Sequence, residues 1–240
     1  MRFCIVLCIF GLAAASFDYT GRPTLEDLQQ FYSSGQPIYM LKRSFELLYN
    51  SDHVICIYNE KQAFEDRKLT LKEAYALGTS VYYYTVTIRL TPGEGRDDAP
   101  VMEATPGQYK WSDFSTKQTW GGGRYEQGRN SRQYRFQYYD ESKHCAVLTF
   151  NDGITRCELH FWASAKTFVT PRQPTRKEPS PPPSGFENCE REYKNLCPNA
   201  TSYKVYNHEC EGWFPSKLRG LPWQPVLDAE NKVQHFSSSR

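Results

Sequence analysis

The chain has 240 residues, with 29 basic and 27 acidic side chains and a formal net charge of +2. This balance gives no reason to expect binding to nucleic acid or to a membrane surface, since both favour a strongly basic chain. The aromatic content is high, with 17 Tyr, 14 Phe and 5 Trp. Such a content suits an enclosed cavity, and it suits any β-rich core equally well.

The first residues have the pattern of a secretory signal peptide. Arg2 precedes a short apolar run that ends at Ala15, and small residues before Phe17 suit cleavage. A membrane anchor is the alternative, but the run is shorter than the roughly 20 residues that span a bilayer. We therefore expect residues 1–16 to be removed and the mature protein to be secreted.

Six cysteines remain after the signal peptide, and an even number in an oxidising compartment predicts three disulfides. The sequence leaves their pairing open. Zinc binding is the rival use, but no Cys-x-x-Cys pair is present. We therefore expect no metal. Asn199 begins the one N-glycosylation sequon, in a polar stretch that should be exposed.

Secondary-structure signals begin with a helix over residues 24–34, in which Thr24 caps the N-terminus and Leu25, Leu28 and Phe31 share one face. Alternating or β-rich patterns then predict strands over residues 38–49, 53–58, 79–90, 133–139, 144–150 and 155–163. The glycine-rich, charged middle adds strand signals near Val101 and over residues 109–111. Many short strands with a flanking helix predict an antiparallel barrel or sandwich over residues 17–169.

The rest of the chain divides into three parts. Residues 170–185 are rich in proline and predict an extended linker. Residues 186–196 have helical spacing and open a cysteine-bearing segment that ends at residue 210. Residues 211–240 show no clear period, so we expect a loosely ordered tail.

A hairpin near residue 152 carries most of the functional argument. Asn151-Asp152-Gly153 predicts a three-residue loop, which would pair Val147 with Cys157, Ala146 with Glu158 and His144 with His160. One face would carry Cys145, Val147, Cys157 and Leu159. This face should be the outer one, because its cysteines must receive the C-terminal helix through disulfides. The inner face would carry His144, Ala146, Leu148, Glu158, His160 and Trp162. A two-residue loop would exchange the faces.

Glu158 would then lie inside the barrel. A buried carboxylate is costly unless it is paired or hydrogen-bonded. One interpretation is that Glu158 meets a polar or cationic ligand. The other is that Tyr, Arg or His side chains of the wall satisfy it.

This arrangement resembles the histamine-binding protein family, the secreted lipocalins of tick saliva. The frame that carries the resemblance is Cys145-Ala146-Val147, Glu158-Leu159-His160 and Cys189, with further cysteines at Cys56 and Cys210. The resemblance implies an all-β, eight-stranded antiparallel lipocalin-like barrel with an N-terminal helix and a disulfide-stapled C-terminal helix. It also implies the disulfides Cys56–Cys210, Cys145–Cys189 and Cys157–Cys197.

Two departures from the family pattern concern the ligand. Ala146 stands where amine binders carry Asp, and His160 stands where they carry Trp or Tyr. A further acidic position falls on Leu48, unless Asp52 replaces it under a shifted alignment. These changes predict a weaker amine site or a more apolar lipid ligand. The predicted ligand-binding residues are Glu158, His160, His144, Trp162, Ala146, Tyr82, Tyr84 and Phe45.

The function expected from this resemblance is a monomeric salivary protein that traps a small host mediator and so blunts host inflammation and haemostasis. The family implies histamine or another biogenic amine as this mediator, while the apolar changes favour a lipid. The chain has no Gly-x-Ser-x-Gly, His-Glu-x-x-His or Walker pattern, and we expect neither catalysis nor a cofactor. The alternative is a protein that inhibits host complement or platelets through its surface, using the linker and the tail.

Overall fold

The computed structural model describes residues 22–49, 52–78, 80–95, 98–107, 131–169, 185–207 and 209–213. The predicted signal peptide, nearly all of the linker, most of the tail and the strand signal at residues 109–111 lie outside these ranges. No helix in the described ranges is long and apolar enough to cross a membrane.

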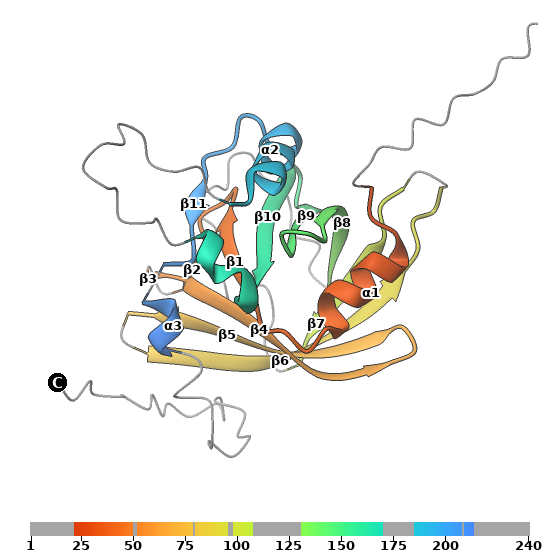
Figure 1. The fold of residues 1–240 in the computed structure, drawn as a ribbon. Helices are drawn as coiled ribbons and strands as arrows, with labels where there is room; N and C mark the ends of the chain where they lie inside the picture. Colours follow the sequence, from red (N-terminus) through yellow and green to blue (C-terminus); the bar gives the residue numbers. More distant parts are fainter. Residues whose placement is uncertain are drawn as a thin grey trace, which may run out of the picture.

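The described residues form a closed antiparallel barrel of eight strands (Figure 1). The barrel strands are β1 (Ile38–Arg43), β4 (Ile55–Glu65), β5 (Lys68–Leu77), β6 (Ser80–Thr91), β7 (Val101–Pro106), β8 (Arg132–Asp140), β9 (Cys145–Asn151) and β10 (Thr155–Trp162). Each strand pairs with the next, and β10 pairs with β1 to close the ring. The expected all-β, lipocalin-like barrel is therefore confirmed.

Smaller elements surround this ring. The short β11 (Tyr203–Lys204) pairs with β1, and β2 (Leu48–Tyr49) pairs with β3 (Asp52–His53) in the connection between β1 and β4. A 3-10 helix, η2 (Ala163–Phe168), follows β10. The helices are α1 (Leu25–Ser33), α2 (Glu187–Leu196) and α3 (Cys210–Trp213).

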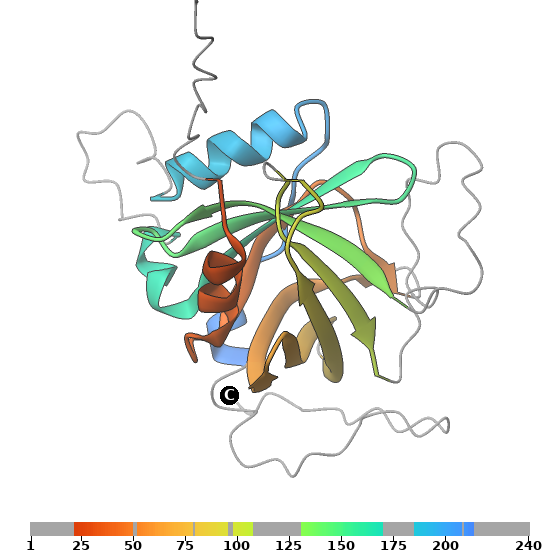
Figure 2. The same cartoon turned by 90° about the vertical axis from the view of Figure 1, so that its right-hand side faces the viewer.

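Helix α1 covers one end of the barrel. It starts where predicted, because Thr24 and Asp27 form a capping box that satisfies exposed backbone N–H groups of the first turn. Phe31 is fully buried and packs against Phe136 of β8 and Trp162 of β10. Figure 2 shows α1 beside the strand ends. Helix α1 also contacts β4 and β6, so it lies across the end of the barrel and is not part of its wall.

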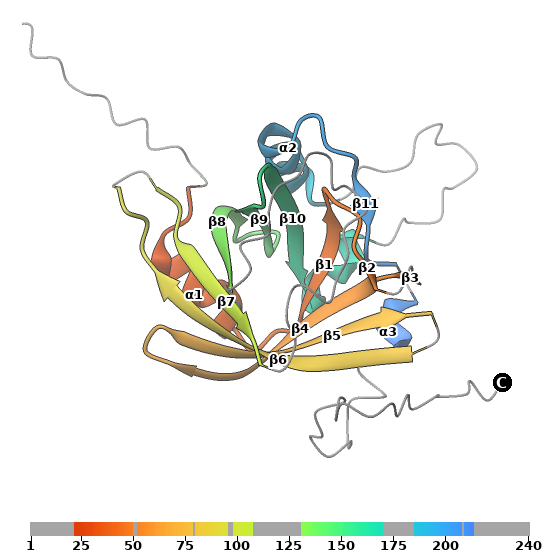
Figure 3. The same ribbon diagram turned by 180° about the vertical axis from the view of Figure 1, so that it is seen from behind.

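Helix α2 packs on the outside of the barrel, across β8, β9 and β10 (Figures 1 and 3). Three disulfides fix the C-terminal segment to the barrel. They join Cys145 to Cys189, Cys157 to Cys197 and Cys56 to Cys210, which are the pairs that the family resemblance implied. These cysteines, with Phe161, Phe186 and Tyr193, belong to a buried cluster between the barrel and α2.

The β9–β10 hairpin differs from the predicted register by one loop position. Asn151 is the last residue of β9 and pairs with Thr155, so the loop is Asp152–Gly153–Ile154. The Asn151 side chain accepts a hydrogen bond from the Gly153 N–H, and Gly153 takes a φ of +102°. The predicted pairs were therefore wrong: Ala146 faces His160, Glu158 faces Leu148, and Val147 faces Leu159.

The division of this hairpin into two faces is nevertheless as predicted. Each β9 residue pairs with a β10 residue two positions later than expected, and side chains alternate between faces with a period of two, so the same residues share a face. Cys145, Val147, Cys157 and Leu159 lie in the outer cluster against α2. Ala146, Leu148 and Trp162 lie in the inner cluster. Glu158 therefore points into the barrel.

Candidate ligand-binding site

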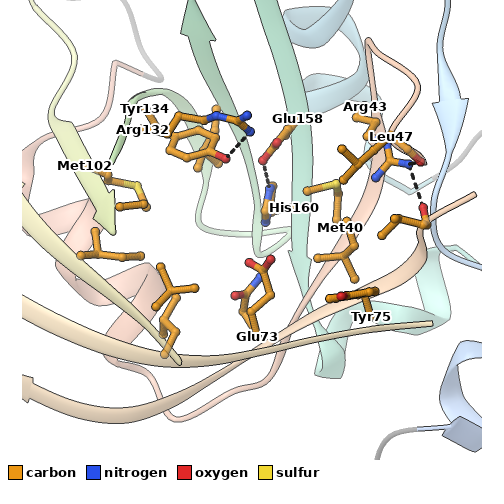
Figure 4. Close-up of a pocket in the computed structure, with 18 of the residues that line it drawn as sticks. Met40, Arg43, Leu47, Glu73, Tyr75, Met102, Arg132, Tyr134, Glu158 and His160 are labelled. Carbon is orange, nitrogen blue, oxygen red and sulfur yellow. Dashed lines mark hydrogen bonds and ion pairs between the residues drawn. The ribbon is translucent and has the colours of Figure 1, made fainter. Parts of the chain in front are cut away.

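A cavity of about 60 Å³ lies inside the barrel, and all eight barrel strands and α1 contribute to its lining (Figure 4). Such a volume holds several waters or part of a small organic molecule. Most of the lining is apolar or aromatic. The charged or titratable side chains among it are Arg43, Glu73, Arg132, Glu158 and His160 together with four tyrosines.

Glu158 and His160 form a buried pair on β10. Two residues apart on one strand, they point to the same face, and each is only 4% exposed. The Nε2 atom of His160 lies 3.0 Å from Oε2 of Glu158. The other ring nitrogen of His160, Nδ1, is buried and has no hydrogen-bond partner among the described residues. The wall thus satisfies part of the Glu158 carboxylate and leaves His160 with one unused nitrogen.

Glu73 of β5 supplies a second carboxylate to the cavity. It accepts a hydrogen bond from the Tyr84 hydroxyl on the neighbouring strand. Burial raises the pKa of Glu73 to about 6, while the Tyr84 hydrogen bond opposes this rise and the nearby Glu158 adds to it. Figure 4 shows Glu73 pointing from β5 toward His160, with Glu158 on the far side of that ring.

Arg43 of β1 enters the cavity because of a β-bulge. The pairing with β10 shifts between Met40 and Lys42, so Leu41 and Lys42 both face outward and Arg43 turns inward. Its Nε donates to the Phe45 carbonyl at 3.0 Å and its Nη2 to the Val54 carbonyl at 2.7 Å. Burial lowers the pKa of Arg43 to about 10, which the nearby Glu158 partly offsets.

Aromatic rings complete the cavity. Tyr32, Tyr75, Tyr84, Tyr134 and Phe45 line it. Arg132, at the start of β8, lies 4.3 Å above the Phe150 ring and donates to the Tyr134 hydroxyl at 3.4 Å. A cation inside would therefore meet aromatic rings as well as carboxylates.

The structure places half of the predicted ligand-binding residues in the cavity. Glu158, His160, Tyr84 and Phe45 line it, and His144, Trp162, Ala146 and Tyr82 do not. His144 lies in the turn before β9 and stacks on Trp162 with 4.3 Å between ring centroids. The Trp162 Nε1 donates a hydrogen bond to the backbone carbonyl of Phe31 in α1.

Ala146 and Tyr82, the other two predicted residues that do not line the cavity, also pack within the fold. Ala146 is fully buried in the inner core, and Tyr82 stacks on Tyr75. Asp52, the acid that could replace the one expected at position 48, is exposed in β3 and also lies outside the cavity. The presence of these residues on or near the inner face was therefore a poor guide to which of them reach the cavity.

Four further residues that line the cavity were not predicted from the sequence: Glu73, Arg43, Arg132 and Tyr134. A signal existed for Glu73, since Leu69, Leu71, Tyr75 and Leu77 alternate around it and one acid on that apolar face needs a partner. Arg43 had no such signal, because only the bulge turns it inward.

The described arrangement is a lipocalin-like barrel whose cavity carries two carboxylates. No known protein family and no curated protein matches the chain. Among solved structures, Japanin from Rhipicephalus appendiculatus bound to cholesterol is 12% identical with a TM-score of 0.45, covering 73% of this chain and 95% of that chain. The AM182 serotonin complex is also 12% identical with a TM-score of 0.45, covering 82% and 97%. Likeness at this level carries no inference about the ligand.

Proposed function

We propose that the protein sequesters a small aromatic amine, of the biogenic amine class, inside its barrel. The observation that carries this proposal is the pair Glu73 and Glu158, two carboxylates from opposite walls of one aromatic-lined cavity. An ammonium group bonded to a carboxylate forms a charge-assisted hydrogen bond, and the surrounding rings add cation–π attraction.

Glu73 changes the balance between an amine and a lipid. The absence of Asp at position 146 and at position 48 favoured an apolar ligand, because it removed two acids from the site. Glu73 restores a second acid from a strand that the family frame does not include. The cavity of about 60 Å³ also favours a one-ring or two-ring amine over a sterol or an eicosanoid, because the smaller ligand displaces fewer wall side chains.

The proposed role is binding without catalysis. Three disulfides are typical of proteins of oxidising compartments, and together with the signal-like N-terminus they support secretion. The resemblance to salivary lipocalins supports a host mediator as the ligand, removed by affinity and abundance.

Isothermal titration calorimetry of the secreted protein tests the proposal. The ligands are histamine, serotonin, arachidonate and cholesterol, and the variants are Glu73→Gln and Glu158→Gln. Each variant should weaken amine binding roughly 10- to 150-fold, because a hydrogen bond to a charged group contributes about 1.5–3 kcal/mol. Glu103→Gln is the matched control. Its neighbours Met102 and Ala104 line the cavity, so Glu103 faces outward on β7.

Three outcomes would contradict the proposal. Binding of a lipid alone would restore the apolar interpretation. Equal loss of amine and lipid affinity in Glu158→Gln would make that residue structural. Failure of all four ligands to bind would favour the alternative of a surface-acting inhibitor of complement or platelets.

A further inference from the structure

Asn199 lies in the turn that follows helix α2. The helix ends just before Cys197, because Pro198 has no backbone N–H to continue its hydrogen bonds. The Ala200 N–H donates to the Cys197 carbonyl at 3.3 Å, so residues 197–200 form a β-turn with proline at the second position, where it is favoured. Asn199 occupies the third position of this turn.

The whole sequon faces solvent. All residues from Pro198 to Ser202 are exposed, as the sequence predicted for this polar stretch. Both residues that define the sequon, Asn199 and Thr201, belong to it. An N-linked glycan is bulky and is compatible with a folded protein only at the surface. The native fold can therefore carry a glycan on Asn199 without any rearrangement of the turn.

A disulfide fixes the position of this turn on the barrel. Cys197 is bonded to Cys157 of β10 and belongs to the outer cluster. Its Sγ atom lies 3.8 Å from the carbonyl oxygen of Thr155, the first residue of β10. Two residues of chain span at most about 7 Å, so Asn199 lies near the hairpin end of β10, on the outside of the barrel. Neither Asn199 nor Thr201 lines the cavity.

We infer that Asn199 carries an N-linked glycan, which stands at the end of α2 and outside the ligand cavity. In the transfer, the side-chain amide nitrogen of Asn199 attacks the anomeric carbon of an oligosaccharide that is linked to a lipid diphosphate. The new N–C bond replaces the C–O bond to the diphosphate, which leaves, and the amide nitrogen loses one of its two protons. The donor belongs to the secretory compartment. The inference therefore rests on the secretion that is part of the proposed function, and it is independent of the ligand.

Two variants of Thr201 test whether the sequon is used. The full chain is expressed in cultured mammalian cells, collected from the medium and treated with peptide N-glycosidase F. Thr201→Ser keeps the sequon and Thr201→Ala removes it. The unchanged protein and Thr201→Ser should lose mass on treatment, and peptide mass spectrometry should show Asn199 converted to Asp. Thr201→Ala should lose no mass. Secreted protein without a glycan on Asn199 would overturn the inference and leave the proposed amine trap standing.

Treatment of the native protein tests the exposed position. Because residues 198–202 are exposed, the enzyme should release the glycan from the folded protein as completely as from the denatured protein. Release after denaturation alone would contradict this position. If Thr201→Ala is not secreted, the peptide analysis of the unchanged protein decides the matter. An unchanged protein that stays inside the cells without a glycan would overturn secretion and this inference together.

Discussion

In Glu73, burial and ionisation oppose each other. Burial favours the neutral carboxyl group and raises its pKa to about 6, whereas the Tyr84 hydroxyl, His160 and Arg132 favour the carboxylate. At the neutral pH of blood and tissue most of the group is ionised, so it can accept an ammonium group. A modest fall in pH protonates it. The residue that is proposed to bind the amine is therefore also the one that makes binding depend on pH.

Amine affinity should fall as the pH is lowered through about 6, the pKa to which Glu73 is raised. Above this value the carboxylate is present and affinity is constant. Below it, each pH unit should cost up to about tenfold, because the amine must displace a proton. Calorimetric titration of serotonin between pH 5 and pH 8, values chosen to bracket that pKa, measures the profile. Glu73→Gln should lose this dependence; the same slope in the variant would assign the effect to another group.

Trp162 illustrates how a residue on the correct face can serve the fold instead of the site. Its indole N–H donates to the Phe31 carbonyl at 3.0 Å, and its ring lies between Phe31 and His144. The interaction holds α1 over the end of the barrel. The family frame could not distinguish this role from ligand binding, because both need an inward aromatic side chain at the end of β10.

Trp162→Phe should therefore reduce stability and leave amine affinity unchanged. Loss of the indole donor costs about 1–3 kcal/mol of unfolding free energy, measured by urea unfolding followed by far-UV circular dichroism. Calorimetry on the folded variant should give the same amine affinity within about twofold, since Trp162 does not line the cavity. A large loss of affinity with normal stability would restore Trp162 as a ligand-binding residue.

At the scale of elements, the sequence predicted the strands with clear alternation and the capped helix, but no strand over β5. In that strand the inner face reads Leu69, Leu71, Glu73, Tyr75 and Leu77. Glu73 interrupts the apolar pattern, and Lys and Ala on the other face lower the strand propensity. The strand was missed because it carries a charge into the barrel, and that same charge is the reason we propose a role for it in ligand binding.

The hairpin register shows a second limit. Asn, Asp and Gly all favour turns, so Asn151, Asp152 and Gly153 could form the loop with equal justification. The structure selects the later loop, in which Asp152 pairs with Arg156 and Ile154 remains 56% exposed. Local turn propensity therefore predicted the length of the loop but not its position. The position that the chain adopts is accompanied by the Asp152–Arg156 ion pair.

The disulfides of α2 should contribute to stability and not to ligand binding. Cys145 and Cys189 join β9 to α2 on the outer face, on the opposite side of the sheet from the cavity. The double variant Cys145→Ala/Cys189→Ala should lose about 2–5 kcal/mol of unfolding free energy, measured by urea unfolding. Its amine affinity below the unfolding transition should stay within about twofold. A collapse of affinity would show that α2 controls the shape of the cavity.

Across the whole molecule, the buried apolar side chains form two clusters, one outside the barrel wall and one inside it. The outer cluster, with the three disulfides, lies between the barrel wall and the C-terminal segment. The inner cluster gathers apolar side chains from the barrel interior and from α1. Because the outer cluster and the α1 end bury apolar surface without using the cavity, the barrel interior can hold two carboxylates, two guanidinium groups and a histidine at a cost that the rest of the fold offsets.

This division predicts that ligand binding raises thermal stability substantially. An amine that binds only the native barrel, at a free concentration of about 100 times its Kd, adds about 2.7 kcal/mol. For a domain of this size that corresponds to a rise in Tm of about 5–10 °C, measured by differential scanning fluorimetry at neutral pH. The double variant Glu73→Gln/Glu158→Gln should show almost no rise at the same amine concentration. It should still melt in one transition, because the double variant leaves both apolar clusters unchanged. An equal rise in the double variant would mean that the amine binds elsewhere on the molecule.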